Sequence, residues 1–73
     1  MGVGMMEYEL NKAQNAISDE WLAKRFWSRA KAFQWQSNFV NYARNLGVAI
    51  QTKKEHPIKS SSYSIVRYRI KPE

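Results

Sequence analysis

The residues whose type and spacing favour a specific chemistry are cations in the second half of the chain. Lys53 and Lys54 are adjacent, Lys59 follows them, and Arg67 and Arg69 are two positions apart. Ammonium and guanidinium groups bind phosphate oxygens, and a guanidinium can donate two parallel hydrogen bonds to one phosphate. We therefore expect these five side chains to contact nucleic-acid phosphates, with an affinity that falls steeply as the salt concentration rises.

A purely structural interpretation of the same cations competes with phosphate binding. Lysine on an edge strand keeps hairpins from aggregating, which is a sufficient reason for Lys53, Lys54 and Lys59. Arg67 and Arg69 would share one face of a strand, because side chains two positions apart point the same way. That face is either an ordinary solvated surface or a contact for DNA or for an acidic partner.

The charge is divided unevenly along the chain. Residues 1–20 hold one cation, Lys12, against four carboxylates, whereas residues 21–72 hold eleven cations against Glu55 alone. All 73 residues together carry a net charge of +6, and the basic part contains all three Trp and all three Phe residues. A basic and aromatic segment can pack a core and still present a cationic face, so double-stranded DNA is the expected partner.

Several other kinds of site lack the residues that they would need. The chain has no Cys and a single His, His56, so neither a thiolate zinc centre nor a multi-His metal site can form, and no cofactor is expected. His56 has no nucleophile or carboxylate partner in the pattern that acid–base catalysis requires, so we expect no enzymatic activity and no small-molecule ligand. No apolar run approaches the ~18 residues of a membrane span, which favours a cytoplasmic protein without a membrane partner.

Apolar residues recur at helical spacing in the first thirty positions. Met6, Leu10, Ala13 and Ile17 share one face of a helix expected over about 6–17. Ser18 and the two acids after it predict the start of a second helix over about 19–30, since a Ser cap and negative charge both favour a helix N-terminus. Its buried stripe is formed by Leu22, Phe26 and Ala30.

A third helix is expected after an irregular connection. Residues 31–36 show no clear period and are expected to form this connection. Ser37 or Asn38 can cap the helix, and Gly47 stands where a left-handed residue ends it. The predicted buried stripe of this helix consists of Phe39, Val40, Ala43 and Leu46.

The pattern then changes to the period of two that is typical of strands. Residues 48–54 and 63–70 predict two strands, the second with a core face formed by Val66, Tyr68 and Ile70. The expected fold class is therefore α+β, with three helices followed by a two-stranded β-hairpin. Residues 6–71 are expected to form a single domain behind a flexible tail of residues 1–5.

This order of elements resembles a known family of folds. The residues that carry the likeness are 21–26 as a second helix, 38–48 as a third helix that ends in Leu-Gly-Val, and 53–63 as a basic wing. The pattern resembles winged helix-turn-helix DNA-binding domains and is most similar to small phage and mobile-element regulators. The resemblance implies a small winged-helix regulator of transcription or recombination that binds double-stranded DNA. Helix three would enter the major groove and the wing would contact phosphates.

The exposed side of this third helix supplies the candidate base-reading residues. Arg can bind guanine O6 and N7 together, and Asn can bind adenine N6 and N7, although an ordinary solvated helix face has the same composition. Residues at the start of the helix can donate to a phosphate. The complete candidate DNA-binding set is Gln36, Ser37, Asn38, Asn41, Arg44, Asn45, Gln51, Lys53, Lys54, Lys59, Arg67 and Arg69.

Two further interpretations concern protein partners. The acidic first helix either covers the core or forms a surface for a homodimer or another protein. The whole chain could instead be a small phage-type inhibitor that docks on a host protein through its basic and aromatic face. Phe33 and Trp35 would then be the hot spot of that interface. A steep salt dependence of DNA binding would separate the first function from the second.

Overall fold

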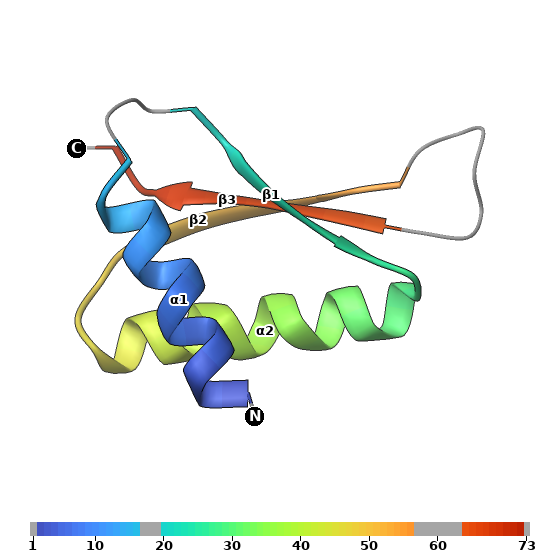
Figure 1. Cartoon of the computed structure of the whole chain (residues 1–73), viewed down its shortest axis with the longest axis horizontal. Coiled ribbons are helices and arrows are strands. Elements are labelled where there is room, and N and C mark those ends of the chain that lie inside the picture. The colour runs from blue at the N-terminus through green and yellow to red at the C-terminus, as the bar shows by residue number, and fades with distance from the viewer. Residues whose placement is uncertain (1, 17–19, 57–63, 73) are drawn as a thin grey trace.

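The computed structural model describes residues 2–16, 20–56 and 64–72 (Figure 1). Two helices and three strands follow one another along the chain. In order they are α1 (Gly2–Gln14), β1 (Leu22–Phe26), α2 (Arg29–Asn45), β2 (Ile50–Glu55) and β3 (Ser64–Ile70). Because α1 begins at Gly2, the first helix includes most of the segment that was expected to form a flexible tail.

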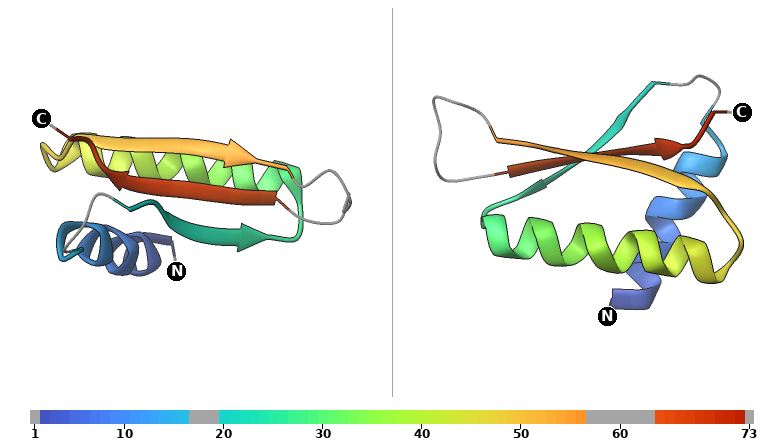
Figure 2. Two further views of the ribbon diagram at one scale, coloured as in Figure 1. Left: turned by 90° about the horizontal axis from the view of Figure 1, so that it is seen from above. Right: turned by 180° about the vertical axis from the view of Figure 1, so that it is seen from behind.

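The three strands form one antiparallel sheet with the last strand, β3, in the centre. The order across the sheet is β1-β3-β2. Tyr68 of β3 lies between Leu22 of β1 and Thr52 of β2. Both helices lie on the same side of the sheet, and α2 runs lengthwise along β2 (Figures 1 and 2). The result is a two-layer molecule whose shortest extent between Cα atoms is 16 Å.

The expected fold class is wrong in its elements. The protein has two helices and a three-stranded antiparallel sheet, not three helices followed by a two-stranded hairpin. Residues 22–26 form a strand in which Leu22 and Phe26 face the helices and Ala23 and Arg25 face away. The spacing of four between Leu22 and Phe26 is typical of a helix, but four is also a multiple of the strand period of two.

The second error lies in the segment expected to connect two helices. Residues 31–36 form part of one continuous helix, α2, which spans 17 residues. Ser28 caps its first turn, because the Ser28 hydroxyl oxygen accepts a hydrogen bond from the Lys31 backbone N–H at 3.3 Å. No Gly or Pro interrupts the helix before Gly47, whose φ of 74° supports the predicted stop.

An aromatic cluster between α2 and the sheet forms the centre of the core. The Trp35 ring stacks on Phe39 with 4.6 Å between the ring centres, and Tyr68 meets Phe39 edge-on at 5.4 Å. Leu10 and Ala13 of α1 pack against the same cluster. The predicted inward side of the first helix is thus confirmed at Leu10 and Ala13, both of which are buried, while Ile17 lies outside the described residues.

One buried polar group attaches α1 to the sheet. Glu9 is 6% exposed, and its carboxylate accepts hydrogen bonds from the Tyr68 hydroxyl and, at 3.2 Å, from the Lys24 ammonium. A buried carboxylate without partners would be costly, so this pairing with two donors fixes where α1 sits. The attachment joins the first helix to both the central strand and β1.

The C-terminal hairpin confirms the strand prediction most closely. Val66 and Tyr68 are fully buried on the face toward the helices, and Ile70 packs against the same core. The predicted stripe of the third helix holds at Phe39 and Ala43, which are buried. It fails at Leu46, which is 58% exposed because it is the C-cap of α2, where the chain leaves the core.

Candidate nucleic-acid interface

The face of the sheet turned away from both helices gathers most of the strand cations. Side chains alternate between the two faces of a sheet, and the register therefore fixes which residues share this surface. We call it the open sheet face. It consists of Trp21, which directly precedes β1, together with Ala23, Arg25, Gln51, Lys53, Glu55, Ile65, Arg67 and Arg69.

The position of Trp21 joins all three strands on this face. The guanidinium carbon of Arg69, on β3, lies 4.3 Å from the centre of the Trp21 ring, and the Lys53 ammonium, on β2, lies 4.6 Å from it. The Arg69 Nε also donates to the Gln51 side-chain oxygen at 2.9 Å. Cation–π contacts and this hydrogen bond hold the two cations in place before any ligand arrives.

One ion pair stands beside this group. The Arg67 Nε donates to a Glu55 carboxylate oxygen at 2.7 Å. The hydrogen bond from Arg67 is the main cause that lowers the pKa of Glu55 below its ordinary value, and the positive charges of Arg67 and Lys53 act in the same direction. Burial opposes the shift. Glu55 therefore stays ionised at neutral pH and partly neutralises the cationic face.

The balance of charge on the open sheet face remains positive. The described strand residues on this side include four cations and one carboxylate. The cations are Arg25, Lys53, Arg67 and Arg69, and the carboxylate is Glu55. A surface with several fixed cations attracts a polyanion and can contact its phosphates without reading bases.

The structure separates the candidate DNA-binding residues into two groups. Gln51, Lys53, Arg67 and Arg69 come together on the open sheet face. The candidates from the middle and end of α2 are exposed on the helix and do not belong to the open sheet face. These are Ser37, Asn38, Asn41, Arg44 and Asn45. Ser37 and Asn41 share a hollow with Thr52 of β2, and Arg44 shares one with Ile50 of β2, so this part of α2 borders the edge of the sheet.

Three candidates belong to neither group. Gln36 is half-buried and donates to the Thr52 hydroxyl at 2.9 Å, so it joins α2 to β2. Lys54 points to the helix side of the sheet, opposite to its neighbour Lys53, and its ammonium lies 5.0 Å from the Phe33 ring centre. Lys59 lies outside the described residues.

Sequence reasoning missed Trp21 and Arg25 as members of this surface. Both belong to the segment for which the sequence predicts a helix, with Trp21 at the edge of its buried stripe. The alternation of Leu22, Lys24 and Phe26 was the available signal, because it places Arg25 on the other side of a strand. Of the two aromatics expected in a protein hot spot, Phe33 is 61% exposed, whereas Trp35 belongs to the core.

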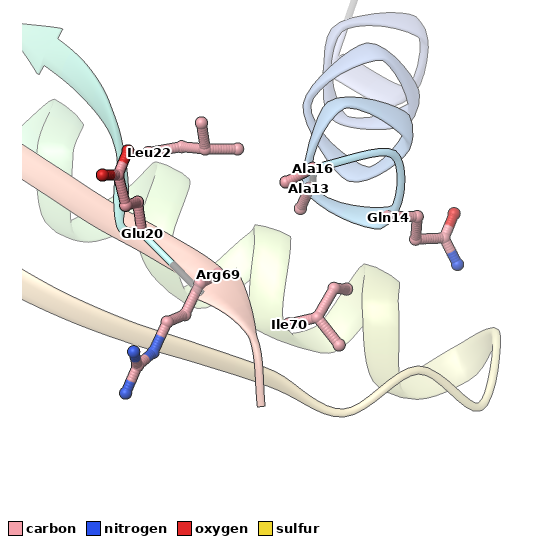
Figure 3. Close-up of a pocket in the computed structure, with 7 residues that line it drawn as sticks. All are labelled: Ala13, Gln14, Ala16, Glu20, Leu22, Arg69 and Ile70. Atoms are coloured by element: carbon pink, nitrogen blue, oxygen red, sulfur yellow. The ribbon is translucent and has the colours of Figure 1, made fainter. Parts of the chain in front are cut away.

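A small pocket lies between the end of α1 and the sheet (Figure 3). Leu22 of β1 points toward Ala13 of α1 and toward Ala16, which follows α1, and the Arg69 side chain points away. Its volume of about 200 Å³ is below the roughly 300–1,000 Å³ of typical ligand sites. Within residues 2–16, 20–56 and 64–72, no group of three His, Asp or Glu side chains is placed to hold a metal ion.

In the part of the chain that the structure describes, no helix has the length and apolar character of a membrane span.

The comparisons of this chain with known proteins gave no match. No family model matches the sequence, and neither the curated proteins nor the solved structures include a match.

Proposed function

We infer that the protein binds double-stranded DNA through the open sheet face. The observation that supports this most directly is the cluster of Lys53 and Arg69 around Trp21, with Arg25 and the Arg67–Glu55 pair on the same surface. Fixed cations on a rigid surface bind phosphates at a lower entropic cost than mobile lysines in solvent, because their side chains are already ordered. The interaction is therefore mainly with the DNA backbone.

The shape of this surface favours a duplex over a single strand. Single-strand binders stack bases on open aromatic rings, but the described aromatic ring on this face, Trp21, has two cations within 5 Å of its centre. The open sheet face is three strands wide, because β1 and β2 pair with opposite edges of β3. Arg67, Arg69 and Lys53 on this face would contact phosphates along the backbone of a duplex.

This proposal gives α2 a supporting role instead of a recognition role. The buried side of α2, with Ala32, Phe39 and Ala43, packs against the sheet. Its exposed residues include Asn41 and Arg44, which lie outside the open sheet face. The phosphate contacts of this proposal therefore come from the sheet.

The test is fluorescence anisotropy with a labelled random-sequence duplex and the matching single strand, titrated from low to physiological salt. The Lys53→Ala/Arg69→Ala variant is compared with Lys31→Ala/Arg44→Ala, which removes the same charge from α2. We expect the sheet variant to lower the slope of log affinity against log salt by about 2, since each lost phosphate contact contributes about 0.9. The α2 variant should keep the wild-type slope.

Three results would contradict duplex binding by the sheet. The first is equal loss of slope in both variants, because binding would then reflect net charge alone. The second is tighter binding of the single strand than of the duplex. The third is no binding of either nucleic acid at low salt.

A further inference from the structure

A groove runs along the outer edge of the sheet, between α2 and β2. One section of about 350 Å³ is lined by residues that include Phe33, Val40 and Thr52. The next section, of about 410 Å³, is lined by Val40 again and by residues that include Ile50 and Arg44. Because Val40 lines both sections, they adjoin along α2.

The lining of this groove combines an apolar floor with cations at both ends. Phe33, Val40 and Ile50 supply the apolar surface, and Phe33 is 61% exposed. Arg44 and Lys71 line one end. At the other end the Lys54 ammonium lies over the Phe33 ring. Among the described residues, no Asp or Glu lines either section.

The neighbouring strand offers a backbone edge as well. β2 is an outer strand, because β3 is its partner on one side and no described strand pairs with its other side. An edge strand presents N–H and C=O groups that can pair with another extended chain. Peptide recognition by strand addition uses such an edge, with pockets beside it that receive alternate side chains.

We propose that this groove binds an extended acidic peptide of a partner protein, which adds as a strand to β2. Apolar side chains of the peptide would lie on Val40 and Phe33, and its carboxylates would contact Arg44, Lys71 and Lys54. The apolar floor and the open backbone edge favour a peptide over a nucleic acid, whose phosphates need neither. The site is separate from the open sheet face and does not depend on DNA binding.

A second copy of this chain is a poor occupant. The longest run of acids in the sequence is Asp19-Glu20. Of the other acids in the described part, Glu7 and Glu9 lie in the helix α1, and Glu55 is paired with Arg67. The chain therefore has no extended acidic segment to place in the groove of another copy, and the charge pattern points to a different protein.

The test uses a panel of labelled peptides of about eight residues, the length of a strand, with Glu or Asp at alternate positions and varied apolar residues between them. Matched peptides with Lys in place of the acids serve as controls. Binding is followed by fluorescence anisotropy and located by amide chemical-shift changes in the ¹⁵N-labelled protein. We expect at least one acidic peptide to bind, with the largest shifts in β2 and the exposed side of α2.

Two charge-reversal variants decide where the peptide binds. Arg44→Glu/Lys71→Glu should lower the affinity for the acidic peptide by at least about tenfold. Lys53→Glu/Arg69→Glu, with the same change in net charge on the open sheet face, should leave the affinity within about twofold. Both variants alter exposed or half-buried side chains, and an amide spectrum confirms that each is folded.

Five outcomes would overturn the proposal. Four of them are equal weakening by both variants, equal binding of the Lys peptides, shifts confined to the open sheet face, and no acidic peptide bound at about 1 mM. Shifts in β2 and α2 produced by duplex DNA, but by no peptide, would also overturn it and would make the groove a nucleic-acid site. A separate failure of the duplex titration would leave the peptide result unchanged.

Discussion

The hydroxyl of Tyr68 donates a hydrogen bond to the carboxylate of Glu9, although 59 positions separate the two residues in the sequence. Tyr68 lies at the centre of the sheet and Glu9 on the first helix. The bond therefore joins an early element of the chain to its last strand. Lys24 of β1 completes the group through the second carboxylate oxygen, so each of the three partners comes from a different element.

We expect Tyr68→Phe to destabilise the fold through this group. The variant keeps the ring contacts with Phe39 and Trp35 but removes one of the two hydrogen bonds to a buried carboxylate. The free energy of unfolding should fall by about 1–3 kcal/mol at neutral pH. Urea unfolding measures this difference. An unchanged midpoint would show that Lys24 alone satisfies Glu9.

The difference between wild type and Tyr68→Phe should shrink in alkali. Burial is the main cause that raises the pKa of Tyr68 above its ordinary value of 10.0, and the hydrogen bond to Glu9 adds to it. Below about pH 10 the phenol is protonated in both the folded and the unfolded chain. Above that pH only the unfolded chain loses the proton, so wild type loses stability that the variant, which has no phenol at this position, cannot lose. Unfolding midpoints from pH 8 to 11 measure this, and a constant difference would contradict it.

We expect Glu55→Gln to strengthen duplex binding. The substitution removes the carboxylate of the open sheet face and releases the Arg67 guanidinium for a phosphate. The salt slope should therefore steepen by up to about 0.9. Since Arg67 lowers the pKa of Glu55, wild-type affinity should not rise on acidification until the pH falls below the ordinary value of 4.5. A rise that is complete above pH 5 would argue against this role for Glu55.

Phe39→Ala should leave little or no stable fold. Phe39 is fully buried and contacts both Trp35 and Tyr68. Such truncations cost about 3–5 kcal/mol, whereas a domain of this size is stabilised by only about 4–11 kcal/mol in total. Thermal unfolding followed by circular dichroism measures the loss. Phe33→Ala is the matched control, because Phe33 is mostly exposed on the same helix, and its midpoint should stay near that of wild type.

Gly47→Ala should cost about 1 kcal/mol through the backbone alone. The residue has a φ of 74°, and a Cβ built there would meet no atom within 4 Å. Gly47→Asn should cost less, since Asn tolerates the left-handed conformation better. Urea midpoints of the two variants test this order, and equal midpoints for Ala, Asn and Gly would exclude backbone strain at this turn.

The parts of the fold that could be predicted from the sequence are the segments whose apolar residues fit only one of the two periods, that of a helix or that of a strand. Val66, Tyr68 and Ile70 alternate over a segment rich in β-branched and aromatic residues, which no helix explains. Leu10 and Ala13 are three positions apart, which a strand does not explain. Gly47 marks the end of α2 because only glycine takes a positive φ without strain.

The part that failed depended on contacts between distant residues. In the sequence Lys24 has the pattern of a solvent-exposed cation in a helix, but its ammonium is held by Glu9 on another element. Phe33 disturbs the apolar period of α2 because it lies outside the core, beside Lys54. The predicted DNA-binding residues are divided between different surfaces for the same reason, because contacts between distant residues decide which side chains share a surface. The sequence indicates which cations are candidates for phosphate binding, but not which of them share one surface of the fold.

The central position of β3 also determines when the protein can fold during its synthesis. β1 and β2 do not pair with each other, and each pairs only with β3. No strand pairing of this sheet can form until residues 64–70 have left the ribosome. Until then the aromatic surface of α2 and the edges of both earlier strands stay uncovered, and surfaces of this kind are prone to aggregate.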